Sequence, residues 1–210
     1  WLSAEFMENG WSVKRIHYLI VTSRTYQQSS GVNDQHLAQD PENRWLARMP
    51  MRRLDAEMIR DSLLAIADVL LLQPFGPADG VTSRADGLVV SQDTQGAWRR
   101  SIYVLHRRTT MPTLLVNFDR PRLSPNCIER TDSTVAPQAL HLMNDKQIHH
   151  WAELFAGRVQ TSAGNDSAQR IHYAYLCATG RAPTDAEMKV AILFLEKLTA
   201  QWQSQQAANA

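Results

Sequence analysis

Apolar side chains recur at helical spacing along most of the chain, and this pattern predicts a mainly α-helical fold. The clearest example is Arg52 to Leu72, where Ile59, Leu63, Ile66, Ala67 and Leu70 share one face of a helix. Residue types that favour helix starts precede further amphipathic segments at Ser12, Pro112, Pro137, Asp145, Asp166 and Thr184. We therefore expect a multi-helix globular domain of about seven or eight helices.

Only one segment has the short, apolar and β-branched character of a strand, Ser101 to His106. We accordingly expect at most a short strand or hairpin near residues 99–108. The polar stretches from Ser29 to Pro41 and from Val81 to Ala97 predict loops. A single helical domain over residues 1–200 is expected, followed by a Gln/Ala-rich helix end that frays over residues 201–210.

Composition and motifs exclude several classes of function. The formal net charge is +1, which argues against a nucleic-acid binder. No apolar run approaches the ~18–20 residues that cross a bilayer, so the chain is not expected to be transmembrane. The sequence has no H-E-x-x-H, paired C-x-x-C, P-loop, G-x-S-x-G or C-x-x-C-H motif. We therefore expect no metal and no cofactor in this segment.

Two carboxylates four residues apart, Glu57 and Asp61, are candidates for chemistry because they project from one helical face. They could share a proton in acid–base catalysis or bind a hard cation. Alternatively, the two carboxylates are neutralised in a structural network by Arg53, Arg60 or an arginine from elsewhere. We favour this second interpretation, because charged pairs on helices are usually solvated or paired.

The arginine pairs form a second candidate site. Arg100 and Arg108 flank the expected strand at an even spacing, which places them on one face. With Arg107 they could bind an anion or an acidic glycan, since guanidinium groups match carboxylates and phosphates. The alternative is that these arginines pair inside the fold with Glu57, Asp61, Asp119 and Asp132.

Cys127 lies close in sequence to Arg130, whose charge could activate the thiol if His106 or His141 were near. A buried, inert cysteine is the interpretation that we favour. Cys127 and Cys177 allow one disulfide at most. Trp45 and Trp98 lie near expected loops, where an indole could stack on a sugar ring.

The order of short motifs along the chain carries a family resemblance. The motifs are Gly10-Trp11-Ser12-Val13-Lys14, Ser23-Arg24-Thr25-Tyr26-Gln27-Gln28-Ser29, Arg52-Arg53-Leu54, Arg99-Arg100-Ser101-Ile102-Tyr103, Thr134-Val135-Ala136-Pro137-Gln138-Ala139-Leu140, Met143-Asn144-Asp145 and Gly180-Arg181. Together they resemble domain of unknown function 1553, a PSD-type domain toward the C-terminus of large planctomycete proteins.

The resemblance implies the C-terminal part of a larger exported bacterial protein, located outside the cytoplasm, in the periplasm or secreted. It implies that cytochrome-c-like segments, and thus haem, can occur elsewhere in the parent protein. It assigns no activity and no catalytic residue.

Two hypotheses of function remain open. The first is a non-catalytic module that is structural or binds a partner, either another domain of the parent chain or a polysaccharide. Its candidate ligand-binding residues are Arg100, Arg107, Arg108 and Arg130. The alternative is a glycan-directed hydrolase or a polysaccharide-binding domain that uses Glu57, Asp61 or Asp119.

Overall fold

The computed structural model describes residues 1–107, 109–121, 127, 130 and 132–209. The chain divides into two compact units, Trp1–Arg53 and Leu54–Ala210, and each is described by itself. The expected single domain over residues 1–200 stays a prediction.

The first unit contains three short helices, α1 (Leu2–Glu8), α2 (Val13–Val21) and α3 (Asp34–Gln39). Ser12 caps α2 as predicted, because its hydroxyl accepts a 3.3 Å hydrogen bond from the amide of Arg15. The prediction of a loop throughout residues 29–41 is wrong at α3. There the Asn33 side chain accepts a hydrogen bond from the amide of His36 and starts a helix within a polar sequence.

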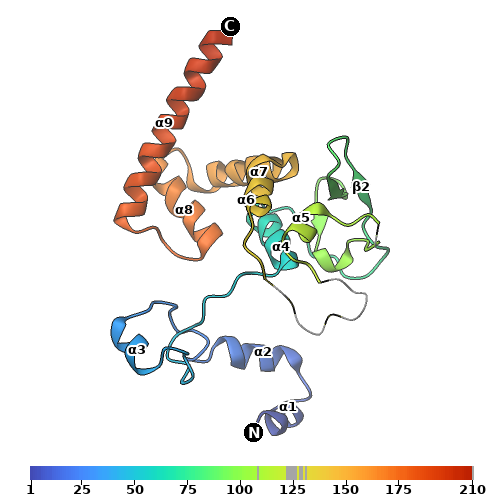
Figure 1. Ribbon diagram of the computed structural model, residues 1–210, viewed down its shortest axis with the longest axis vertical. Coiled ribbons are helices and arrows are strands. Elements are labelled where there is room, and N and C mark those ends of the chain that lie inside the picture. Colours follow the sequence, from blue (N-terminus) through green and yellow to red (C-terminus); the bar gives the residue numbers. More distant parts are fainter. Residues whose placement is uncertain (108, 122–126, 128–129, 131, 210) are drawn as a thin grey trace. The chain divides into compact units, whose positions relative to one another are not determined.

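The second unit is built on α4 (Ala56–Ile66) (Figure 1). Helix α4 contacts α5 (Thr113–Asn117) and α7 (Lys146–Ala163), and α6 (Ala136–Asn144) contacts both α5 and α7. The buried core between them is apolar and contains Ala56, Leu64, Ala67, Trp98, Leu114, Leu115, Phe118 and Trp151. The indoles of Trp98 and Trp151 meet edge to face with ring centroids 5.6 Å apart. This core holds α4 in place, so that its opposite face is available to form a site.

Helix α4 is shorter than the predicted helix over residues 52–72. Asp55 precedes its first residue, and it ends before Asp68, whose φ of 63° lies in the left-handed region. The remaining apolar residues form β1 (Leu70–Leu71), which pairs in parallel with β4 (Trp98–Arg99). A short apolar run suits a strand as well as a helix, and here the pairing with β4 decides between them.

The other extended segments differ from the predicted strand in position. An antiparallel hairpin joins β2 (Val81–Ser83) to β3 (Val89–Ser91), within the stretch that was expected to be loop. Residues Ser101–Tyr103 form the 3-10 helix η1 instead of a strand. The cause is a side chain of α4, because Asp61 accepts hydrogen bonds from both the amide and the hydroxyl of Ser101 and turns the backbone there.

The C-terminal helices follow the predicted caps closely. Asp145 caps α7 through the amides of Gln147 and Ile148, and Asp166 caps α8 (Ser167–Thr179). Gly180 ends α8 in the left-handed conformation, which glycine adopts without strain.

The last helix, α9 (Asp185–Asn209), begins with the predicted capping box between Thr184 and Glu187. It packs on α8 and extends beyond it (Figure 1). None of the helices described combines the length with the apolar character that crossing a bilayer requires. The prediction of a mainly α-helical fold with only short strands is confirmed.

Candidate functional site

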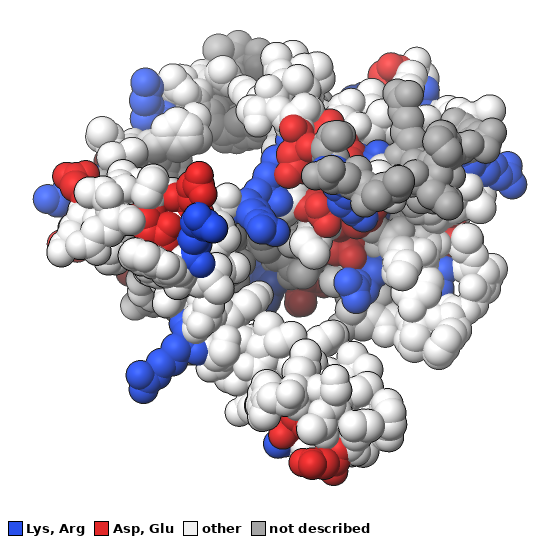
Figure 2. All heavy atoms as spheres, turned by 60° about the horizontal axis from the view of Figure 1, so that its bottom comes forward, with Lys and Arg blue, Asp and Glu red and all other residues white. Residues whose placement is uncertain are grey.

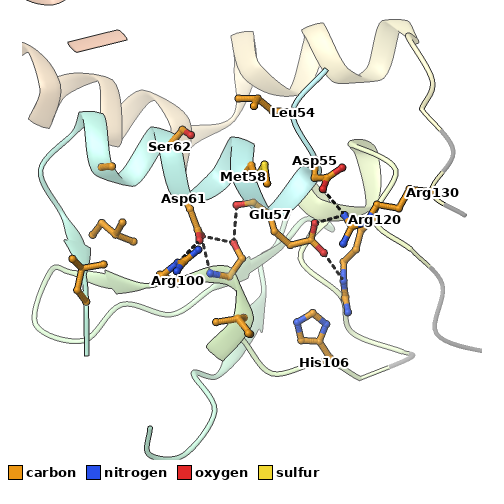
Figure 3. Close-up of a pocket in the computed structure, with 15 residues that line it drawn as sticks. Leu54, Asp55, Glu57, Met58, Asp61, Ser62, Arg100, His106, Arg120 and Arg130 are labelled. Atoms are coloured by element: carbon orange, nitrogen blue, oxygen red, sulfur yellow. Dashed lines mark hydrogen bonds and ion pairs between the residues drawn. The ribbon is translucent and has the colours of Figure 1, made fainter. Parts of the chain in front are cut away.

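A pocket of about 810 Å³ lies along the face of α4 that carries Glu57 and Asp61 (Figure 3). The two carboxylates project from the same side of the helix, as their spacing of four residues predicts. Arg100 and Ser101 line the pocket beside Asp61, and Arg120 and Arg130 line it beside Glu57. His106 lies across the pocket from α4 (Figure 3). The structure therefore brings together Glu57, Asp61, Arg100 and Arg130 from the candidates.

Asp61 is occupied by protein partners on both carboxylate oxygens. Its Oδ1 accepts hydrogen bonds of 2.7 Å from the amide and from the hydroxyl of Ser101. Its Oδ2 accepts a 3.2 Å hydrogen bond from Nε of Arg100. A guanidinium nitrogen of Arg60 lies 3.6 Å from Oδ1. These bonds join α4 to the segment after β4, so Asp61 acts as a structural anchor.

Glu57 is held by two arginines from outside its helix. Nη1 of Arg130 donates a 2.8 Å hydrogen bond to Oε2 and lies 3.4 Å from a carboxylate oxygen of Asp55. Nε of Arg120 lies 3.9 Å from Oε1. Burial raises the pKa of Glu57, but the hydrogen bond from Arg130 and the two positive charges outweigh it and lower the pKa below the ordinary value. The group therefore stays ionised, whereas a general acid needs a raised pKa.

Arg60 is the buried centre of the arrangement, with a relative exposure of 1%. Its guanidinium donates hydrogen bonds to the carbonyl of Arg99 at 3.0 Å, the hydroxyl of Ser91 at 2.8 Å and the hydroxyl of Ser101 at 3.3 Å. Burial lowers the pKa of Arg60 to about 10, although Asp61 and Asp79 oppose the shift. From the sequence we predicted Arg60 only as a possible partner of Glu57 and Asp61. The hydroxyls that accept its hydrogen bonds are distant in sequence and gave no signal.

Arg99, the neighbour of Arg100, faces a different loop. Its Nε donates a 2.8 Å hydrogen bond to Asp79, and its Nη1 donates a 2.7 Å hydrogen bond to the carbonyl of Phe75. It also donates to the carbonyl of Pro77 and lies 4.7 Å from the ring centroid of Tyr103. Arg99 thus fastens the loop that follows β1 and has no part in the pocket.

Asp119 is separate from the pocket. It accepts hydrogen bonds from the amide of Ser133 at 2.8 Å and from its hydroxyl at 2.7 Å. The side-chain amide of Gln138 lies 3.4 Å from the same carboxylate and donates a 2.9 Å bond to the carbonyl of Asn117. Asp119 therefore organises the approach to α6. That an arginine also pairs with Asp119 stays a prediction.

The remaining candidates are placed elsewhere or differ from expectation. Arg107 forms an isolated β-bridge with Thr110 and does not line the pocket, and Arg108 lies outside the described residues. The prediction of a buried Cys127 is wrong, since this thiol is exposed, and neither cysteine forms a disulfide. His141 is buried, and this burial lowers its pKa. Trp98 belongs to the core, so Trp45 is the exposed one of these two tryptophan candidates for stacking.

In Figure 2 some blue and red side chains of the described residues lie beside one another, and other blue side chains stand apart from red ones. Among the residues that the structure describes, no group of three or more His, Cys, Asp or Glu side chains could hold a metal ion. The site is thus a pocket with paired charges on a helical scaffold.

The geometry defines a helical domain with a pocket whose carboxylates, Glu57 and Asp61, are paired with arginines. The family model of PSD1, Protein of unknown function (DUF1553), matches residues 1–195. The chain belongs to this family, which confirms the family that the sequence motifs predicted. No curated protein and no solved structure matches the chain.

Proposed function

We propose that this chain is a non-catalytic binding module of an exported protein, and that the pocket on α4 takes a segment of another polypeptide. The observation that carries the proposal is the pairing of Glu57 and Asp61 with arginines and Ser101. The lowered pKa of Glu57 keeps this carboxylate ionised, so it does not supply the proton donor that glycoside hydrolysis needs. The hydrolase alternative has no comparable support.

The lining of the pocket supports a polypeptide as the ligand. Four large aliphatic or thioether side chains around it are exposed, with Leu72 at 75% and Ile102 at 76%, together with Leu54 and Met58. Exposed apolar groups beside arginine are typical of protein interaction surfaces. The described lining contains no Trp, Tyr or Phe on which a sugar ring could stack.

Arg100 supplies the polar part of this surface. Its side chain is 59% exposed, and its bond to Asp61 uses Nε, so the two terminal nitrogens belong to a largely solvated group. A guanidinium in this position can bind a carboxylate of the partner. We infer a partner segment that presents apolar side chains and a carboxylate, and another domain of the same parent protein would supply one.

Photo-crosslinking of the full-length parent protein tests the proposal. Benzoylphenylalanine replaces Ile102 in the pocket, and the matched control replaces Leu140, which is also exposed but lies on α6 outside the pocket. We expect a defined polypeptide segment to crosslink at position 102, and Arg100→Glu to reduce the yield. Equal crosslinking at positions 102 and 140 would refute the proposal.

A further inference from the structure

Trp45 in the first unit is an exposed indole on a loop that its neighbours hold in a fixed conformation. The side chain is 75% exposed. Tryptophan is usually well covered in folded proteins, and exposed examples on ordered loops are common at binding sites. The loop runs from Asp40, directly after α3, to Arg48.

The side chain of Asp40 fixes the backbone of Trp45 through hydrogen bonds. This buried carboxylate accepts 2.8 Å hydrogen bonds from the amide of Arg44 on one oxygen and from the amide of Trp45 on the other. The hydrogen bond from the Trp45 amide is the main cause that lowers the pKa of Asp40. The backbone that carries the indole is therefore fixed by the hydrogen bond from the Trp45 amide to Asp40.

Arg48 and Asn43 close the loop from its other end. Nη2 of Arg48 donates a 2.9 Å hydrogen bond to the carbonyl of Pro41, and Nη1 donates a 3.3 Å bond to the carbonyl of Asp40. The side chain of Asn43 donates to the carbonyl of Arg48 at 2.8 Å and accepts from its amide at 3.2 Å. A loop braced in this way loses little conformational entropy when a ligand binds.

A hollow of about 590 Å³ lies beside the indole, within the usual size range of small-ligand sites. Apart from Trp45 and Pro41, its lining is polar and consists of Gln39, Asp40, Glu42 and Arg44. Gln39 offers an amide donor and acceptor, Glu42 an acceptor and Arg44 several donors, and all three residues are exposed. The hollow therefore combines the apolar face of the Trp45 indole with hydrogen-bonding groups beside it.

We propose that Trp45 and this polar hollow bind a neutral saccharide. A pyranose ring presents a face of C–H groups that packs on an indole, while its hydroxyls both donate and accept hydrogen bonds at the ring edge. Two acidic groups and one arginine in the lining disfavour an anionic ligand such as a nucleotide. An apolar protein anchor would form no hydrogen bonds with these polar groups. The proposal is independent of the pocket on α4.

Titration calorimetry of the whole chain with cellohexaose, laminarihexaose, chitohexaose and mannohexaose tests the inference. We expect at least one of these oligosaccharides to bind with a Kd of about 1 mM or lower, and Trp45→Ala to weaken binding about tenfold or more. Trp45→Phe retains an aromatic face and should bind within a few-fold of the unmodified chain.

The matched control is Trp202→Ala, which removes an indole of similar exposure, 64%, from α9. It should leave saccharide binding unchanged, and circular dichroism checks that both alanine variants keep their helical content. Absence of binding to all four oligosaccharides, or equal affinities for the two alanine variants, would overturn the assignment.

Discussion

The buried guanidinium of Arg60 gives the sharpest test of the reasoning about this fold. Arg60→Met keeps most of the side-chain volume but removes three hydrogen bonds, to the Arg99 carbonyl and to the hydroxyls of Ser91 and Ser101. It also removes the positive charge 3.6 Å from Asp61. Truncating one partner of a buried charged network costs about 3–5 kcal/mol, because the groups left behind lose their partner. We expect a loss of this size in the free energy of unfolding.

Urea unfolding, followed by near-ultraviolet circular dichroism, measures this loss. Trp98 and Trp151 lie in the core of the second unit and report on its packing. The matched control is Arg100→Met, which breaks an ion pair to the same Asp61 from an exposed position and should cost about 0–1 kcal/mol. This expectation is refuted if the free energy of unfolding of Arg60→Met lies within about 1 kcal/mol of that of the unmodified chain, roughly a five-fold change in the folding equilibrium. In that case the buried network does not hold these segments together.

Three further outcomes follow from the contacts described. Leu64→Ala should lower the free energy of unfolding by about 2–5 kcal/mol, since Leu64 is fully buried, whereas Met58→Ala on the exposed face of α4 should cost ~0.5 kcal/mol in the same urea assay. Hydrogen bonds from Arg181 first and from Thr184 next lower the pKa of Glu187 from 4.5 to about 2, so the stabilisation by this carboxylate is complete above pH 4.5 and disappears as the pH falls through about 2. An NMR titration of the Glu187 carboxyl checks the value, and Arg181→Ala should return it towards 4.5; an unchanged midpoint would contradict the assignment. Cys127 should react with Ellman's reagent faster than the other cysteine, which is half-buried, and Cys127→Ser should remove the fast phase.

Most helices whose caps are local in sequence were predictable, but α3 was missed although its cap, Asn33, is also local. Helices α7 and α8 begin at the predicted caps Asp145 and Asp166, and α8 ends at the predicted Gly180. These ends were predictable because a cap needs only neighbours within a few residues. Predictions failed where a distant partner decided the conformation. Leu70 and Leu71 continue a helical pattern but pair with β4, and Ser101 begins a 3-10 turn because Asp61 binds it.

The candidate site was predictable in part for the same reason. The spacing of Glu57 and Asp61 places both on one face of α4, and the expectation of neutralising arginines is confirmed by Arg130 and Arg100. The hydroxyl of Ser101 gave no signal, since serine is common and its role depends on a contact across 40 positions. The expectation of a location outside the cytoplasm stays a prediction.

The contacts of Arg60 have a consequence for synthesis of the chain on the ribosome. Its three partners lie 31 to 41 residues further along the chain. Until residue 101 has emerged, the guanidinium of Arg60 on α4 lacks the three acceptors that it has in the folded protein. It therefore has to stay in contact with water, and α4 cannot be buried. Because domains tend to fold as units once their sequence is available, this part of the second unit should dock only after that point. Nascent chains that stop short of Ser101 should consequently be digested by protease at α4, and chains that extend beyond α7, and so contain the whole core around α4, should resist.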